Sequence, residues 1–226
     1  QKNEVEAQDW KMKAVWTYEG NSNMRSANNL DYEAELTAVL AQEICLELDR
    51  KAFHTMRTKA GTNLAWDFND SLGETIREKY ESLYLHMIDA ARQVGLKTGR
   101  GDANWVVTSP EIASIFETSS TGTYYNDDSE FTSSLGIRYA CDIGSRFKVY
   151  KDPLFPTSQI LMGYKGNHPY DCGYFWCPLT MLKQTPVVLD PDSFTPRRGL
   201  ITSDCHRLAP GGENFFATIN VVNFII

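Results

Sequence analysis

The sequence lacks the features that direct a chain into a membrane or a secretory pathway. No apolar run approaches the roughly 18 residues that a bilayer-spanning helix needs, so we expect no membrane partner. The opening residues, QKNEVEAQDW, have no initiator Met, no basic segment and no apolar segment, unlike a signal peptide. We therefore expect this chain to be a cleaved product or one part of a longer protein.

The five cysteines lack a recognisable pattern. No two cysteines form a C-x-x-C pair, which excludes zinc-ribbon and thioredoxin motifs. The spacings from His168 to Cys172 and from Cys172 to Cys177 match no standard zinc site. We therefore expect no metal, no cofactor and five reduced thiols, at Cys45, Cys141, Cys172, Cys177 and Cys205.

Positive charge is also in deficit. Against 29 acidic residues there are 22 Lys and Arg, giving a net charge of −7. This balance argues against a dedicated nucleic-acid binder, which normally carries a basic stripe, although a surface can still lie beside DNA without gripping it. The 226 residues, 42% of them hydrophobic, suffice for one large domain or two small ones with a real core.

No catalytic constellation emerges, so we expect a protein that is not an enzyme. Lys165 stands between glycines in GYKG, but these are too close together for a phosphate-binding loop and no helix is expected to follow. Cys205 and His206 are adjacent on an expected strand, so their side chains point to opposite faces and cannot form a dyad. Acid pairs stand at helix starts and in turns, where acids are common: Glu33/Glu35, Asp127/Asp128 and Asp190/Asp192.

The first half of the chain alternates between strand and helix patterns. Residues 10–20 alternate loosely and predict a strand, followed by a polar turn with Asn29 as a helix cap. From residue 30 to about 59, apolar residues recur every four positions, with acids at the start and bases at the end. This predicts a helix of about 28 residues, ended by Gly61. Residues 71–95 predict a second amphipathic helix.

The second half becomes rich in strands. NWVVTSPEIASIFET predicts a buried strand and a short helix that starts at Ser-Pro. A polar loop over residues 119–134 is followed by strands punctuated by Gly and Pro. Helices come first and strands later, so the predicted class is α+β.

Several strings then resemble a known family in their order along the chain. EAELTAVLAQEICLELDR resembles the long spine helix of the major capsid protein of T-even-type tailed bacteriophages. NWVVTSPEIASIFE, GSRFKVYKDP, ILMGYKG, PYDCGYFWCPL, DSFTPRRGLIT and NFFATINVVNF resemble later segments of the same family, in register.

This resemblance implies a Hong-Kong-97-type capsid fold, with a peripheral domain around the spine helix and a mixed-sheet axial domain. It implies a peripheral-type region at residues 1–100, an axial-type domain at 101–200, and strands returning to the peripheral region at 201–226. It also implies that RFKVYKDP and ILMGYKG pair as strands, that Asp152-Pro153 turns the chain, and that Gly163–Gly166 closes a hairpin-like unit. The resemblance also implies that the family's N-terminal arm and most of its extension loop are absent from this sequence.

The function implied is that of a structural subunit in the icosahedral head shell of a tailed double-stranded DNA bacteriophage. Such subunits assemble into hexamers or pentamers in the host bacterial cytoplasm and enclose the genome in the virion. Expected partners are further copies of the chain and vertex, decoration, scaffold and portal proteins, with packaged DNA nearby and no sequence-specific contact. The candidate inter-subunit contacts are Arg146, Lys148, Asp152, Lys165, Arg197 and Arg198.

Four alternatives stay open on the sequence. The quoted strings do not separate a hexamer subunit from a pentameric vertex paralogue. An encapsulin-like nanocompartment shell shares the fold. An α+β hydrolase or metal-binding enzyme lacks the necessary residue pattern, and a monomeric binding module of about 26 kDa requires that no shell forms.

Overall fold

The computed structural model describes residues 5–28, 32–69, 75–118, 122–123 and 136–223. The chain forms two compact units, each built from two separate stretches. The first unit contains residues 1–53 and 175–207, and the second contains residues 54–174 and 208–226. These bounds differ from the expected divisions near residues 100 and 200, because the second helix and the last strand both belong to the second unit.

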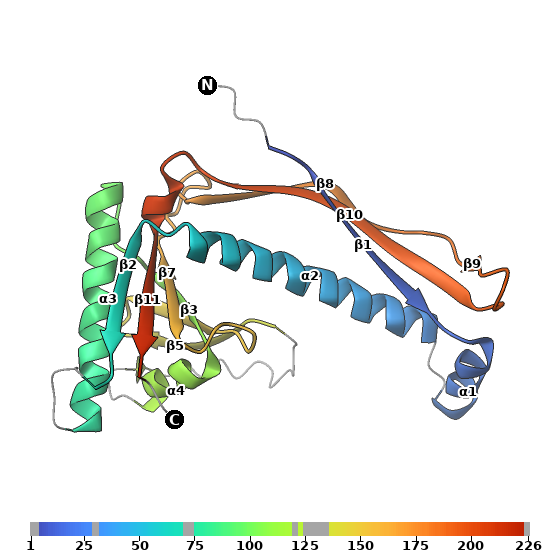
Figure 1. The fold of residues 1–226 in the computed structure, drawn as a ribbon, viewed down its shortest axis with the longest axis horizontal. Helices are drawn as coiled ribbons and strands as arrows, with labels where there is room; N and C mark the ends of the chain where they lie inside the picture. The colour runs from blue at the N-terminus through green and yellow to red at the C-terminus, as the bar shows by residue number, and fades with distance from the viewer. Residues whose placement is uncertain (1–4, 29–31, 70–74, 119–121, 124–135, 224–226) are drawn as a thin grey trace. The chain divides into compact units, whose positions relative to one another are not determined.

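The first unit contains an antiparallel sheet in the order β1-β10-β8, with the short strand β9 paired to β10 (Figure 1). Residues at opposite ends of the sequence meet in it, since the register of β1 against β10 runs from Gln8 opposite Asp204 to Val15 opposite Arg197. The strands are β1 Gln8–Val15, β8 Tyr174–Gln184, β9 Val188–Leu189 and β10 Pro196–Leu208.

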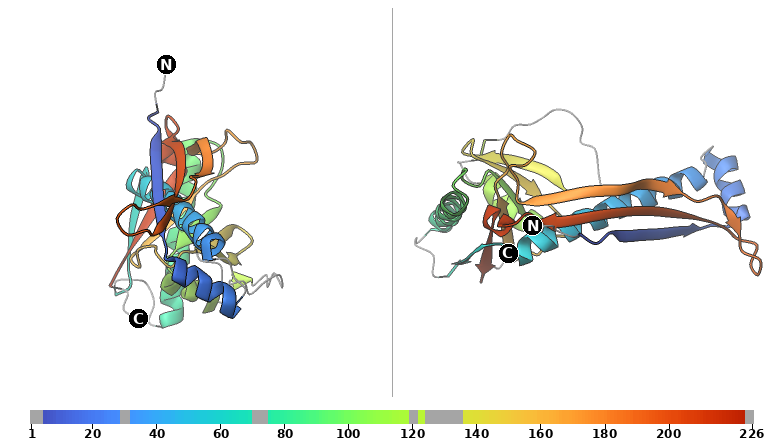
Figure 2. Two further views of the ribbon diagram at one scale, coloured as in Figure 1. Left: turned by 90° about the vertical axis from the view of Figure 1, so that its right-hand side faces the viewer. Right: turned by 90° about the horizontal axis from the view of Figure 1, so that it is seen from above.

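The long helix α2, Tyr32–Thr58, runs along one face of this sheet (Figures 1 and 2). Its 27 residues confirm the predicted long helix, with acids in the first turn and Arg57 in the last, as the helix dipole favours. Ile44 is buried on it, and the Lys51 Nζ atom lies 4.7 Å from the centre of the Trp10 ring on β1. Gly61 follows the helix, as predicted, and its N–H donates to the Glu213 carbonyl at 2.7 Å.

A shorter helix, α1 at Tyr18–Asn28, replaces part of the predicted strand and the predicted polar turn. The prediction was wrong because Thr17 caps this helix. The Thr17 hydroxyl oxygen accepts the Gly20 N–H at 3.1 Å, and the Thr17 carbonyl accepts the Asn21 N–H at 3.1 Å. The proposed cap Asn29 lies outside the described residues.

One buried carboxylate connects the three long strands of the first unit. Asp204 on β10 is 1% exposed. Its Oδ1 atom accepts the Trp10 indole N–H from β1 at 2.6 Å, and its Oδ2 atom accepts the Trp176 indole N–H from β8 at 2.9 Å. His206 Nδ1 lies 3.6 Å from Oδ2. Asp204 therefore links both neighbouring strands to β10 through side chains as well as through the backbone ladder.

The second unit is built on a mixed seven-stranded sheet in the order β2-β11-β7-β3-β6-β5-β4. β2 is parallel to β11 and β3 is parallel to β6, while the other neighbours are antiparallel. The strands are β2 Thr62–Asp67, β3 Trp105–Thr108, β4 Gly122–Thr123, β5 Arg138–Ile143, β6 Phe147–Lys151, β7 Gln159–Gly163 and β11 Phe216–Val222.

Helices α3, Ile76–Thr98, and α4, Pro110–Thr118, pack on this sheet, and a 3-10 turn, Gly212–Phe215, precedes β11. The predicted second helix is therefore confirmed, shifted by a few residues. Its buried side includes Leu83, Met87 and Val94, which join the core of the second unit. Within the described residues, no helix combines the length and the apolar character needed to cross a bilayer.

The predicted pairing of RFKVYKDP with ILMGYKG is wrong. These segments form β6 and β7, and β3 lies between them, parallel to β6 and antiparallel to β7. The reason is that β3 is buried: Val106 is fully buried and Val107 is 3% exposed, so this short apolar strand takes a partner on each edge. The strand and helix predicted for NWVVTSPEIASIFET are confirmed as β3 and α4.

Removing the Asp204 carboxylate should destabilise the first unit. Asp204→Ala leaves the Trp10 indole N–H without its partner, whereas the half-exposed Trp176 can turn to water. We expect a loss of about 1–3 kcal/mol in the free energy of unfolding, and a smaller loss for Asp204→Asn, which keeps one acceptor oxygen. Urea unfolding followed by tryptophan fluorescence measures both variants. Asp192→Ala, at an exposed turn position, is the control, and equal stability of Asp204→Ala and this control would contradict the role.

Candidate subunit interface

The six candidate contact residues are divided between the two units. Arg146, Lys148, Asp152 and Lys165 belong to the second unit, while Arg197 and Arg198 belong to the first.

Arg146 follows a tight turn between β5 and β6. Gly144 and Ser145 both have positive φ, at 59° and 55°, and the Arg146 N–H donates to the Ile143 carbonyl at 3.1 Å. The guanidinium forms an ion pair with Asp102 and lies 5.3 Å from the centre of the Phe147 ring. Lys148 is exposed on β6, so its ammonium group is available to a partner.

Asp152 has a structural role inside the chain. It is 5% exposed, its Oδ1 atom accepts the Leu154 N–H at 3.0 Å, and its carbonyl accepts the Phe155 N–H at 3.1 Å. A side chain that bonds the backbone two residues on is the Asx turn that commonly redirects a chain. The expectation that Asp152-Pro153 turns the chain is therefore confirmed.

The segment around Lys165 is a hairpin-like turn. Lys165 pairs with Cys172 in an antiparallel bridge, and the Gly166 N–H donates to the Asp171 carbonyl at 2.9 Å. The Asn104 side chain bonds both backbone groups of Lys165, at 2.7 and 3.1 Å. Residues 166–173 form no helix, so the exposed Lys165 ammonium has no phosphate-binding helix end beside it.

The glycines in GYKG serve packing. A Cβ atom on Gly163 would lie 2.2 Å from the Trp105 ring, and one on Gly166 would lie 2.0 Å from Asp171 Oδ2. Asp171 in turn pairs with Arg100 at 2.5 Å and accepts the Tyr164 hydroxyl at 3.2 Å. Burial, together with the charge of Asp171, raises the pKa of Tyr164.

Arg197 and Arg198 point to opposite faces of the first unit's sheet. Arg198 lies on the α2 side, where its guanidinium pairs with Glu33 at 2.5 Å and donates to the Thr185 carbonyl at 3.0 Å. Arg197 lies 3.7 Å from Asp190 in the neighbouring turn, with 44% of its side chain exposed. Arg198 is therefore used within the chain, and Arg197 is the more open of the two.

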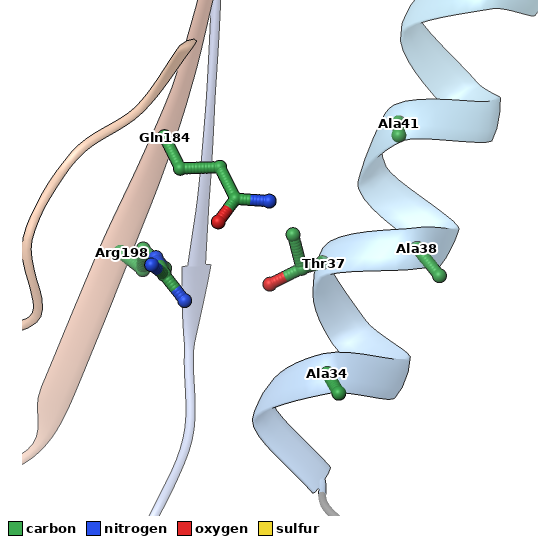
Figure 3. A pocket seen from close by; sticks show the side chains of 6 residues that line it. All are labelled: Ala34, Thr37, Ala38, Ala41, Gln184 and Arg198. Carbon is green, nitrogen blue, oxygen red and sulfur yellow. The ribbon is translucent and has the colours of Figure 1, made fainter. Parts of the chain in front are cut away.

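A groove separates the start of α2 from the end of the sheet (Figure 3). Its volume is about 370 Å³, and Gln184 and Thr37 point toward each other across it. Small side chains at helical spacing line its helix side. The lining residues are Ala34, Thr37, Ala38, Ala41, Gln184 and Arg198.

The sheet face that points away from α2 is cationic and partly apolar. Side chains alternate along a strand, and Trp10, Gln184 and Arg198 mark the α2 side. We call the opposite side the outer face. Its strand residues include five cations and one acid, Asp9, with exposed Leu179 and Met181 between them. The cations are Lys11, Lys13, Lys183, Arg197 and Arg207.

Sequence reasoning missed most of this surface. The available signal was the i, i+2 spacing of Lys11 and Lys13, which places both on one face of a strand. Further exposed apolar residues lie on the short strand β9 and in the turns on either side of it. They are Val187, Val188, Leu189 and Phe194, and Phe194 is 73% exposed.

The described residues give no grouping of three or more His, Cys, Asp or Glu side chains that could hold a metal ion. His206 faces Asp204 on the α2 side, while the Cys205 thiol lies near the Cys177 carbonyl on the outer face. The predicted opposition of Cys205 and His206 is therefore confirmed.

Comparison with known proteins identifies the family. The sequence model of the family described as "Major capsid protein Gp23" matches residues 1–206, which is most of the chain. The chain belongs to this family. The resemblance to the T-even-type major capsid proteins is therefore confirmed.

Individual relatives agree with the family match. The chain is 28% identical over 219 residues to the major capsid protein of Vibrio phage KVP40, covering 88% of the chain and 42% of that protein. It is 26% identical over 222 residues to the major capsid protein of Enterobacteria phage T4, covering 88% and 42%. The chain thus spans less than half the length of the relatives it matches.

Solved structures share the fold at low sequence identity. The capsid of cyanophage P-SCSP1u matches with a TM-score of 0.63 and 9% identity, over 97% of this chain and 74% of that one. The mature capsid of bacteriophage PhiM1 matches with a TM-score of 0.61 and 11% identity, over 98% and 72%. A virus-like particle from Pyrococcus furiosus matches at 0.52 and 8% identity, over 96% and 78%. These likenesses confirm the predicted Hong-Kong-97-type α+β capsid fold.

The packing role of Gly163 is testable. Gly163→Ala should force the Trp105 ring to move and cost about 1–3 kcal/mol of unfolding free energy, as overpacking does. Trp105→Leu makes room for the added methyl group, so the double variant should lose less stability than the two single losses combined. Thermal or urea unfolding of the three variants closes this cycle. Strict additivity would show that the ring does not set the requirement for glycine.

Proposed function

We propose that this chain is part of a structural subunit of the icosahedral head shell of a tailed double-stranded DNA bacteriophage. Subunits of this kind form hexamers or pentamers that enclose the genome in the virion. The observation that supports the proposal most directly is the outer face of the first unit, a cationic and apolar sheet surface on a chain of net charge −7 in the capsid-protein family.

The partner that fits this surface is another copy of the chain. A closed shell needs head-to-tail contacts in which one patch meets a different patch of its neighbour. The five cations of the outer face suit acidic side chains of a neighbouring copy, such as the exposed Glu35 near the start of α2. Exposed Leu179 and Met181 supply the apolar area that an interface centre needs.

The remaining partners follow from the same role. We infer contacts with vertex, decoration, scaffold and portal proteins, and packaged DNA close to the shell without sequence-specific recognition. One of the structural neighbours is a satellite phage P4 procapsid that includes a size determination protein. Assembly would take place in the cytoplasm of the host bacterium, and the subunit's role would be mechanical and not catalytic.

The test is electron microscopy of the intact gene product after sedimentation from its native source. Shells built from rings of five and six are the expected result, and the ring size separates a hexamer subunit from a vertex paralogue. Copurifying DNA separates a phage head from a nanocompartment that encloses an enzyme. A monomer in the same preparation would overturn the proposal.

Charge reversal on the outer face should block assembly while leaving the fold intact. Arg197→Glu inverts a charge that is 44% exposed and whose acidic neighbour is 3.7 Å away, so the free subunit loses little. We expect loss of capsomers in sedimentation and an unchanged circular dichroism spectrum. Lys59→Glu makes the same charge change on an exposed residue outside this face. Normal shells from Arg197→Glu would remove Arg197 from the interface.

A further inference from the structure

Two thiols lie opposite each other on the outer face of the first unit. The Cys205 thiol on β10 lies 3.5 Å from the Cys177 carbonyl oxygen on β8, in position to donate to it. Three residues away on each strand, the Thr202 hydroxyl donates to the Thr180 carbonyl at 2.9 Å. Both contacts fit one antiparallel register, in which Cys177 stands directly across from Cys205.

This register brings the two side chains within bonding range. Directly opposed residues in an antiparallel pair have Cα atoms about 4.5–5.5 Å apart, with both side chains on the same face. Disulfides span Cα separations of about 4.4–6.8 Å. Cys177 is exposed and Cys205 is half-buried, so a reagent can reach the pair from solvent.

The other cysteines do not share this arrangement. Cys45 is exposed on helix α2, and Cys141 is fully buried in the second unit. Cys172, also in the second unit, donates to the Pro169 carbonyl at 3.2 Å. Cys177 and Cys205 are therefore brought together by the pairing of β8 with β10.

We propose that Cys177 and Cys205 form a dithiol site that reacts with low-molecular-weight disulfides, such as oxidised glutathione, and closes into a cross-strand disulfide. The Cys177 thiolate attacks one sulfur of the small disulfide, and a thiolate leaves and takes up a proton. The Cys205 thiol then loses its proton and attacks the Cys177 sulfur of the mixed disulfide, releasing the second small thiol. Two protein thiols are oxidised and one small disulfide is reduced to two thiols, so electrons and protons balance.

The surroundings fix the order of these steps. Cys177 is exposed and Cys205 is half-buried, so the small disulfide reaches Cys177 first. Burial and the neighbouring Cys177 also raise the pKa of the Cys205 thiol, which disfavours its thiolate. Arg207 lies two residues from Cys205 on the same face by strand alternation, and its positive charge favours approach of an anionic small disulfide.

The disulfide would fasten β8 to the centre of the sheet. In the described part of the chain, β8 forms an edge of the sheet, paired with β10 on one side. The new bond would close a loop that contains β9 and the apolar turn at Phe194. This inference does not depend on shell assembly, since it requires only the register of two strands within one unit.

The experiment treats the folded full chain with oxidised glutathione, counts free thiols and maps the linked peptides by mass spectrometry. The expected result is the loss of two free thiols as Cys177 becomes joined to Cys205, with no glutathione retained on either of these two residues. In Cys205→Ala, the Cys177 sulfur should keep one glutathione as a trapped mixed disulfide. Cys205→Ser is the second variant if the alanine variant fails to fold.

Cys45→Ser is the matched control, because it removes an exposed thiol from the same unit outside the pair. It should still lose two thiols to the same cross-link. The proposal is overturned if the wild-type chain keeps a glutathione on each thiol without closing, if another pair of cysteines is joined, or if all five thiols stay free.

Discussion

The first unit depends on the burial of one carboxylate between two indole rings. Asp204 cannot be left without partners at 1% exposure, because a buried charge without hydrogen bonds costs several kcal/mol. Its two oxygens are used by Trp10 and Trp176, which come from the strands on either side. The arrangement fixes which residues of β1 and β8 lie beside β10. It therefore decides which side chains face α2 and which form the outer face.

In the second unit, the packing of an aromatic ring depends on a glycine. Gly163 leaves space for the Trp105 ring, which also packs against Phe216 with ring centres 6.1 Å apart. Three neighbouring strands, β3, β7 and β11, thus meet around one pair of aromatic rings. The first glycine of GYKG, a string that resembles part of a phosphate-binding loop, is therefore required by the packing of these aromatic rings.

The parts of the fold that are local in sequence were predictable. The four-residue spacing in α2, the Ser-Pro start of α4 and the turn at Asp152 each depend on neighbouring residues. Strand order was not predictable in the same way, since β3 inserts between β6 and β7 through contacts more than 40 residues apart. The Asp204 contact to Trp10 spans 194 residues, and no local signal announces it. Helix α1 was missed although Thr17 gave a usable capping signal.

The candidate interface residues were also only partly predictable from the sequence. A resemblance to a family supplies candidate positions, but not the direction in which each side chain points. Alternation along a strand separates Arg197 from Arg198, and only the contacts of Glu33 and Thr185 show that Arg198 is occupied within the chain. The cation pattern on β1 could have been read from the sequence, whereas its continuation on β8 and β10 required the sheet.

The pairing of β1 with β10 also bears on the order of events during synthesis. Gln8 and Asp204 are partners, so β1 leaves the ribosome long before the strand that completes its sheet. During that interval β1 lacks the strand with which it pairs, and the Trp10 indole N–H lacks its acceptor Asp204. Much of the second unit lies within the intervening sequence, but its strand β11, which supplies Ala217 and Ile219 to the core, follows β10. Folding of the first unit is therefore a late, long-range step, of the kind that loop-closure entropy makes slow.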